Sequence, residues 1–141
     1  GDYAVVSKEM NAKMSKYDIK INKLVNEAYD LDFNKTPNLN KNVKTIKGWF
    51  KDTLPKFLKN KKDKISFIHI DCDTYESTKD VFDCIGKERL QKGCILLFDE
   101  YIGYINWQGN EYKAWQEYVK KHKIKYKYVA FGDRQAVIKI I

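Results

Sequence analysis

Apolar residues gather in two short runs near the middle of the chain, and each run ends in acid. Residues 65–70 read Ile-Ser-Phe-Ile-His-Ile, with Lys64 before them and Asp71 after them. A run of this length bounded by charge is typical of a strand that is buried on both faces, as in a parallel sheet. Residues 93–98 form a second apolar run, which leads into Asp99. The pattern therefore predicts two parallel strands.

The segment between the two runs has the spacing of a helix. Ser77 is expected to cap it, because Asp80 follows three residues later as in a capping box. The apolar face of this helix is expected to comprise Val81, Phe82, Ile85 and Leu90. Strand, helix and strand in this order form a βαβ unit, which brings the ends of both strands to one edge of the sheet.

The pattern of apolar residues in the C-terminal third predicts one helix and two further strands. Residues 110–122 carry an apolar and aromatic stripe at helical spacing, and residues 124–130 alternate like a half-exposed strand. Residues 131–134 form a turn before the last strand, residues 135–141. Strands joined by so short a turn are antiparallel. We therefore expect an α/β fold with parallel strands, a C-terminal antiparallel hairpin and helices on the faces of the sheet.

The N-terminal third predicts mainly helix and loop. Apolar residues recur at helical spacing from Met10 to Ala28, and residues 30–42 have the composition of a loop. A short strand is expected over residues 42–47. A short helix capped by Asp52 or Thr53 is expected to follow. The chain is thus expected to be a single domain in which 1–42 is a helical insert or lid region and 43–141 is the strand–helix core.

The amino-acid composition excludes some classes of function. The 141 residues carry a net charge of +8, but nearly all the basic residues are Lys, and only Arg89 and Arg134 can make bidentate phosphate contacts. Nucleic acid is therefore not the expected partner. No apolar run is long enough to suggest a membrane span. Three cysteines without metal-ligand spacing suggest reduced thiols and a cytoplasmic protein.

Carboxylates at the ends of the two central strands are the candidate chemistry. Asp71 and Asp73 follow the first strand, and Asp99 and Glu100 follow the second. Ligands of open α/β sheets bind at this edge, and gathered like charges repel unless a cation lies between them. The acids therefore predict a site for Mg²⁺ or a similar hard cation. Solvated acids without a role, an Asp-x-Asp-x-Thr phosphatase loop and an Asp-x-Asp glycosyltransferase motif are the alternatives.

Four motifs in order resemble the macrocin O-methyltransferase family. They span residues 48–55, 68–78, 97–107 and 111–115. The family comprises class I enzymes with a Rossmann-like sheet, which use S-adenosyl-L-methionine to methylate sugar hydroxyls of natural products. The resemblance covers the chain well from Gly48 onward and loosely before it. It implies a small-molecule substrate with a sugar-type hydroxyl.

The resemblance also implies roles for particular residues. Asp71 corresponds to a metal ligand and candidate base, and Asp99 and Glu100 to the paired acids that complete the metal site. The family usually has Asp at the position of Glu100. Asp73 belongs to the same motif and is a second catalytic candidate. Tyr75, with Asp71, is the candidate for binding the cofactor.

Aromatic residues beyond the second acidic pair are candidates for binding substrate. Tyr101, Tyr104 and Trp107 are expected to stack on a sugar face, unless they simply cover the core. His69 lies in mid-strand, where a packed core histidine is expected rather than a proton acceptor. His122, on a helix stripe, is expected to be structural.

The sequence lacks two features that the resemblance implies. One is a strand with a glycine-rich turn for the methionine end of the cofactor, and the other is a second strand that ends in an acid for the ribose hydroxyls. The chain therefore resembles the C-terminal part of such an enzyme. One hypothesis is a Mg²⁺-dependent sugar O-methyltransferase that requires an N-terminal half. The other is a non-catalytic remnant or interaction module, which self-associates through the stripe from Met10 to Ala28.

Overall fold

The computed structural model describes residues 40–141. The helix expected between Met10 and Ala28 lies outside the described residues, as does most of the expected lid region. The chain divides into two compact units, residues 1–49 and 50–141. In the first unit, residues 43–47 adopt neither helix nor strand, so the strand expected over 42–47 is wrong. Val43 instead donates a backbone hydrogen bond to the carbonyl of Asn40, 2.9 Å away, which closes a turn.

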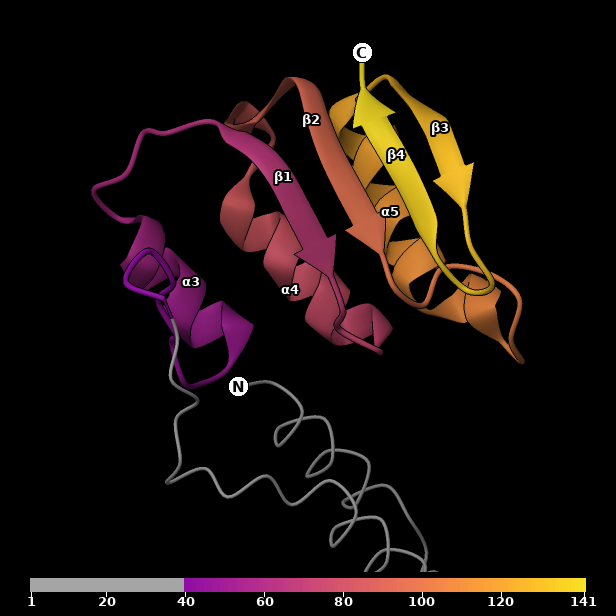
Figure 1. Ribbon diagram of the computed structural model, residues 1–141, viewed down its shortest axis with the longest axis horizontal. Coiled ribbons are helices and arrows are strands. Elements are labelled where there is room, and N and C mark those ends of the chain that lie inside the picture. Colours follow the sequence, from indigo (N-terminus) through magenta and orange to yellow (C-terminus); the bar gives the residue numbers. More distant parts are fainter. Residues whose placement is uncertain (1–39) are drawn as a thin grey trace, which may run out of the picture. The chain divides into compact units, whose positions relative to one another are not determined.

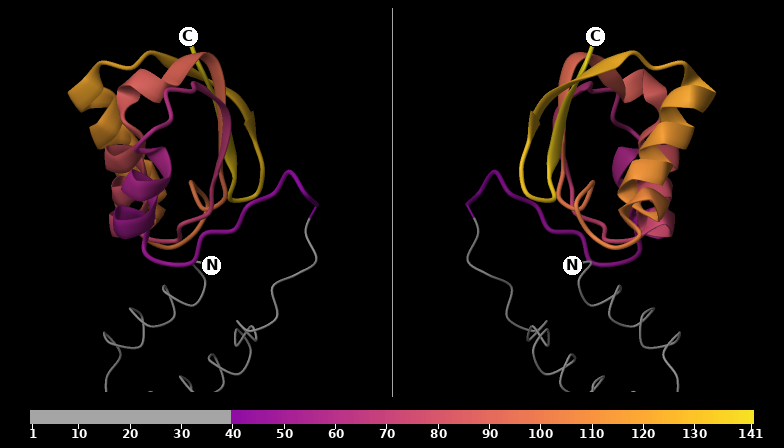
Figure 2. Two further views of the ribbon diagram at one scale, coloured as in Figure 1. Left: turned by 90° about the vertical axis from the view of Figure 1, so that its left-hand side faces the viewer. Right: turned by 90° about the vertical axis from the view of Figure 1, so that its right-hand side faces the viewer.

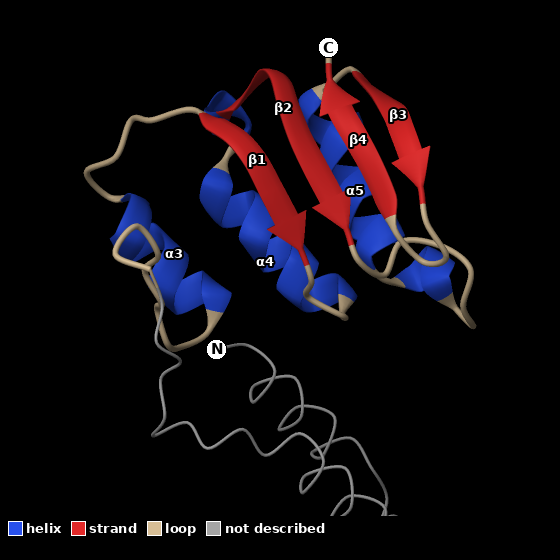
Figure 3. Cartoon of the chain, viewed as in Figure 1, coloured by secondary structure: helices blue, strands red, loops and turns tan. Residues whose placement is uncertain are grey.

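Residues 50–141 contain a four-stranded sheet (Figures 1 and 3). Its strands are β1 (Ile65–Ile70), β2 (Leu90–Phe98), β3 (Tyr126–Phe131) and β4 (Ala136–Ile140), in the spatial order β1-β2-β4-β3. The pair β1–β2 is parallel, whereas β2–β4 and β3–β4 are antiparallel. The predicted α/β fold with a C-terminal antiparallel hairpin is confirmed.

The second central strand is longer than its apolar run predicts. Strand β2 begins at Leu90, three residues before Gly93, because Leu90 pairs with Ile65 at the start of β1. Leu90 therefore belongs to the sheet and not to the preceding helix, as its spacing had suggested.

Three helices, α3 (Phe50–Leu58), α4 (Tyr75–Ile85) and α5 (Glu111–His122), lie on the same face of the sheet (Figure 2). Aromatic rings join α4 and α5 to β2. The ring centroid of Phe82 lies 5.1 Å from that of Trp115 and 5.0 Å from that of Tyr118, and the ring of Phe98 lies 5.7 Å from Trp115. Burial of such large rings stabilises the core.

The opposite face of the sheet is more open than the sequence predicts. Side chains of β1 alternate: Ile70 is buried, whereas Phe67 is 56% exposed and His69 is exposed. The expectation that β1 is buried on both faces is wrong for the described residues, because the helices they form cover one face only. The expectation of a packed core position for His69 is wrong for the same reason. No helix within residues 40–141 has the length and apolar character that crossing a bilayer requires.

The start of α4 is fixed by Thr74. Its side-chain Oγ1 accepts a hydrogen bond from the backbone N–H of Ser77, 3.2 Å away, and its backbone is extended as an N-cap requires. The expected cap, Ser77, instead lies in the first turn. Helix α3 likewise begins at Phe50, so Asp52 lies in its first turn and is not its cap.

We expect Thr74→Ala to lower the free energy of unfolding by about 1 kcal/mol, because it leaves an N–H at the start of α4 without its acceptor. Ser77→Ala is the matched control, since it keeps the backbone N–H and is expected to change stability by less than about 0.5 kcal/mol. Urea unfolding of both variants measures the difference. A larger loss for Ser77→Ala would contradict this assignment of the cap.

Candidate functional site

The loop after β1 makes a tight turn that carries two of the predicted acids. Asp73 has a φ of 57°, in the left-handed region that few residues other than glycine adopt. The backbone N–H of Thr74 donates to the carbonyl of Cys72 at 2.6 Å, which closes the turn. Aspartate tolerates this conformation better than most residues. The turn places Asp73 directly before the N-terminus of α4.

The structure brings the four predicted acids together. The backbone N–H of Asp99 donates to the carbonyl of Ile70 at 2.9 Å, so the parallel pairing of β1 and β2 continues to the acidic ends. Burial raises the pKa of Asp73, and the nearby charges of Asp71 and Asp99 raise it further. Burial and the charge of Asp73 raise the pKa of Glu100. The carboxylates of the two loops therefore lie near enough to influence one another, and we refer to Asp71, Asp73, Asp99 and Glu100 as the carboxylate cluster.

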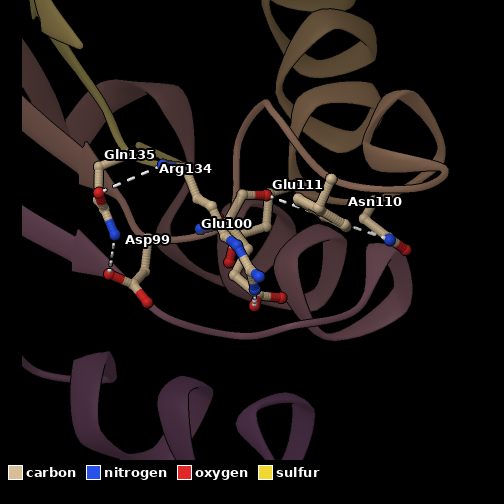
Figure 4. Close-up of polar contacts among 7 residues, drawn as sticks. Asp99, Glu100, Asn110, Glu111, Arg134 and Gln135 are labelled. Atoms are coloured by element: carbon tan, nitrogen blue, oxygen red, sulfur yellow. Dashed lines mark hydrogen bonds and ion pairs between the residues drawn. The ribbon is translucent and has the colours of Figure 1, made fainter. Parts of the chain in front are cut away.

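The turn between β3 and β4 supplies polar partners to this cluster (Figure 4). Gln135 donates from Nε2 to Oδ1 of Asp99 at 3.3 Å, and the guanidinium of Arg134 lies 3.5 Å from Oε1 of Glu100. The backbone carbonyl of Arg134 also accepts from the N–H groups of Tyr101, at 2.8 Å, and Ile102, at 3.1 Å. The hairpin is thus fastened to the loop that follows β2.

The predicted metal ligands are Asp71, Asp99 and Glu100. Their carboxylate oxygens suit a hard cation. Within residues 40–141, however, no three His, Cys, Asp or Glu side chains lie close enough together to hold a metal ion. Contacts with Gln135 and Arg134 engage Asp99 and Glu100 in this arrangement. The donor chemistry therefore fits the expected ion, whereas the side chains as they lie do not converge on one.

Glu111, in the first turn of α5, is a member of the site that the sequence analysis missed. Its side chain is fully buried. Oε1 accepts a hydrogen bond from the backbone N–H of Cys72 at 3.0 Å, and Oε2 accepts one from the backbone N–H of Glu100 at 3.2 Å. A signal was present, since Glu111 precedes Trp115 by four residues and so continues the buried stripe of its helix.

Burial strongly shifts the pKa of Glu111. Removal from water raises its pKa to about 7, although the two backbone N–H bonds favour the charged form and limit the rise. Burial of this carboxylate is tolerated because each of its two oxygens accepts a hydrogen bond.

The three predicted substrate residues occupy different environments. Tyr101 is fully buried, and its hydroxyl bonds to Tyr128 at 2.9 Å and to Gln116 at 3.1 Å. Its ring is therefore part of the core, which contradicts the expected stacking on a sugar. Tyr104 and Trp107 are half-buried in the loop beyond the acids. The hydroxyl of Tyr104 donates to the carbonyl of Glu100 at 3.1 Å.

Tyr75 contacts α5, and His122 lies at the end of that helix. The hydroxyl of Tyr75, the predicted cofactor residue, donates to Oε2 of Glu117 at 2.6 Å, and the ammonium of Lys113 lies 4.7 Å from its ring centroid. His122 packs against Tyr118, with ring centroids 4.4 Å apart, as a structural histidine would.

Comparison with known proteins places the chain among methyltransferases. The family model described as macrocin-O-methyltransferase (TylF) matches residues 4–137. A solved apo structure of CalS11, described as a TDP-rhamnose 3′-O-methyltransferase of calicheamicin biosynthesis, is 27% identical with a TM-score of 0.53, over 67% of this chain and 39% of its own. A second CalS11 structure, described as a calicheamicin methyltransferase, is 24% identical with a TM-score of 0.57, over 89% of this chain and 48% of its own. The chain thus spans less than half the length of these proteins. No protein of curated function matches it.

The perturbed Glu111 predicts how stability depends on pH. Its pKa is about 4.5 when unfolded and about 7 when folded, so the folded state binds the proton more tightly. The contribution of this group to the free energy of unfolding is therefore fully present below pH 4.5. It is lost as pH rises toward 7, by on the order of 3 kcal/mol.

Glu111→Gln removes this titration, so stability is expected to fall less between pH 4.5 and 7 in the variant than in the wild type. Urea unfolding at several pH values, with a chelator present, measures both slopes. Equal slopes would contradict the assignment.

Proposed function

The chain belongs to the macrocin-O-methyltransferase family, and on this basis we propose that the protein transfers a methyl group from S-adenosyl-L-methionine to the hydroxyl oxygen of a sugar. The observation that supports this most is the carboxylate cluster at the carboxyl ends of β1 and β2, in a chain that matches the family model over residues 4–137. A sugar acceptor is favoured because the 27% identical CalS11 structure is described as acting on TDP-rhamnose.

The chemistry requires a proton acceptor near the sugar. A hydroxyl is a weak nucleophile until its proton is removed. When bound, S-adenosyl-L-methionine supplies a methyl group on a positively charged sulfur, and Asp71 and Tyr75 are the residues we propose to hold it. With the cofactor held by Asp71 and Tyr75, its methyl group would pass from the sulfur to the sugar oxygen, which would leave a neutral thioether. The hydroxyl proton passes to a carboxylate of Asp71 or Asp73.

The environment of Asp73 suits that role. Burial and the charge of Asp71 raise its pKa, and a more basic carboxylate takes up a proton more readily. The half-buried rings of Tyr104 and Trp107 border the same loop and are the remaining candidates for packing against the sugar.

A divalent cation such as Mg²⁺ is the proposed second cofactor, with Asp71, Asp99 and Glu100 as its ligands. Support comes from the carboxylate donors and from their mutual repulsion, which a cation would relieve. Such an ion lowers the pKa of a bound hydroxyl. Because Gln135 and Arg134 hold Asp99 and Glu100, binding requires these two contacts to be exchanged.

A non-catalytic interaction module is the second candidate. It is favoured by the exposed apolar surface of the sheet, where Phe67 is 56% exposed. Self-association and assembly with an N-terminal half remain predictions, as does a cytoplasmic location. The three cysteines Cys72, Cys84 and Cys94 are not joined in disulfides.

Asp71→Asn is expected to lower methyl transfer about 100-fold or more, because Asp71 is a proposed ligand of both the cofactor and the metal ion as well as a candidate proton acceptor, and an amide replaces its charge in all three roles. The assay follows S-adenosylhomocysteine formed by the complete gene product that contains this chain, with TDP-rhamnose as acceptor. Asp63→Asn is the matched control, since Asp63 is exposed and lies before β1, at the other end of that strand. Acceptor-independent turnover, or full activity of Asp71→Asn, would contradict the proposal.

Metal binding has a test that needs no activity. Millimolar Mg²⁺ is expected to raise the melting temperature of the wild type and to leave that of the double variant Asp99→Asn, Glu100→Gln unchanged, because binding to the folded state stabilises it. EDTA should reverse the effect. The same response in both proteins would show that the ion binds elsewhere.

A further inference from the structure

We infer that Glu111 is the positioning residue of the carboxylate cluster: its buried side chain holds the loop after β1 and the loop after β2 at a fixed separation. This rests on the proposed function, because the separation matters for methyl transfer only if the acids act on one substrate. Glu111 does not itself touch the reacting atoms. It acts through the backbone of two neighbouring segments.

The two hydrogen bonds lie at the centre of the acidic segments. Cys72, whose N–H donates to Oε1 of Glu111, lies between Asp71 and Asp73 in the sequence. Glu100, whose N–H donates to Oε2, directly follows Asp99. Every acid of the cluster is therefore either bonded through its own backbone or adjacent to a residue that is. A single carboxylate thus joins both loops, as Figure 4 shows for the Glu100 side.

These loops need such a link because their side chains repel each other. Asp71 and Asp73 lie on the loop after β1, and Asp99 and Glu100 lie on the loop after β2, so the parallel pairing of these strands gathers four acids at one edge of the sheet. Repulsion of this kind favours separation of the loops. Hydrogen bonds from backbone N–H groups to a charged acceptor are among the stronger ones in proteins, and they oppose that separation.

The position of Glu111 is itself fixed by the core. It lies in the first turn of α5, and Trp115 and Tyr118 of the next turns pack against Phe82 with ring centroids 5.1 and 5.0 Å away. A carboxylate at a helix N-terminus is also favoured by the helix dipole. The rigid helix–sheet core therefore determines where the two loops are held.

A second contact joins the loop after β2 to the start of α5. The side-chain amide of Asn110 donates to the hydroxyl of Tyr104 at 3.3 Å, and that hydroxyl donates to the carbonyl of Glu100 at 3.1 Å. This path reaches only the loop after β2. Glu111 accepts backbone N–H groups of both loops, whereas the path through Asn110 and Tyr104 reaches one loop only.

Two substitutions separate positioning from general stability. Glu111→Gln keeps the size of the side chain but has one acceptor oxygen, so its NH₂ group faces an N–H donor and one loop loses its bond. Glu111→Asp keeps the charge but is one methylene shorter, so it cannot reach both N–H groups at once. Glu88→Gln is the matched control, because its side chain is 65% exposed and it lies before β2, at the other end of that strand.

The first measurement is amide hydrogen exchange on the whole chain, resolved by NMR. We expect exchange at Cys72, Glu100 or both to be about 10-fold faster or more in the two Glu111 variants, because the bonds that protect these amides are lost. The amide of Asp99, bonded to Ile70, and the amides of α5 should keep their rates, as should all amides in Glu88→Gln. Unchanged exchange at both Cys72 and Glu100, or equally faster exchange throughout the molecule, would overturn the inference.

The second measurement is the kinetics of the complete gene product, normalised to folded protein. In both Glu111 variants kcat should fall about 10- to 100-fold with little change in KM, because small displacements of reacting groups slow the chemical step. Wild-type kcat in a variant with released loops would overturn the positioning role. Lack of methyl transfer by the wild type would contradict the proposed function instead, and the exchange rates would still decide whether Glu111 holds the loops together.

Discussion

Parallel pairing of β1 with β2 is the constraint on which the rest of the site depends. It brings the ends of both strands to one edge of the sheet, and each end carries two acids. Four like charges gathered in this position favour separation of the two loops, which bonds from groups outside these acids oppose. The buried carboxylate of Glu111 provides such bonds, because it accepts N–H groups from both segments at once.

The C-terminal hairpin completes the same edge from the other side. Because β4 runs antiparallel to β2, the turn before β4 lies beside the end of β2. This geometry places Arg134 against Glu100 and Gln135 against Asp99. The guanidinium of Arg134 offsets part of the negative charge of the cluster. Arg134 and Gln135 also contact Glu100 and Asp99, two acids that the resemblance assigns to a metal ion. Binding of a metal ion by Asp99 and Glu100 would therefore require Gln135 and Arg134 to release these two acids.

Two neighbouring tyrosines lie in different environments and make different contacts. Tyr101 and Tyr104 are separated by only two residues, yet the first is fully buried in the core and the second lies half-buried in the loop. The hydroxyl of Tyr101 bonds within the core to Tyr128 and Gln116, whereas that of Tyr104 bonds to the loop carrying Glu100. The core network anchors the segment that follows β2, and the loop contact reaches the backbone of Glu100.

The sequence by itself determined the order and type of the elements in residues 50–141, the direction of the strand pairs and the grouping of the acids. These follow from local periodicity, turn length and the rule that parallel strands end at one edge. Only the tertiary structure decided that Glu111 joins two loops, that Arg134 and Gln135 hold two of the acids, that Tyr101 is buried and that β1 is covered on one face. Thr74 replaced Ser77 as the cap because the turn at Asp73 sets where α4 begins. Each of these depends on which distant segments come into contact, and the pattern along a chain carries that information only weakly.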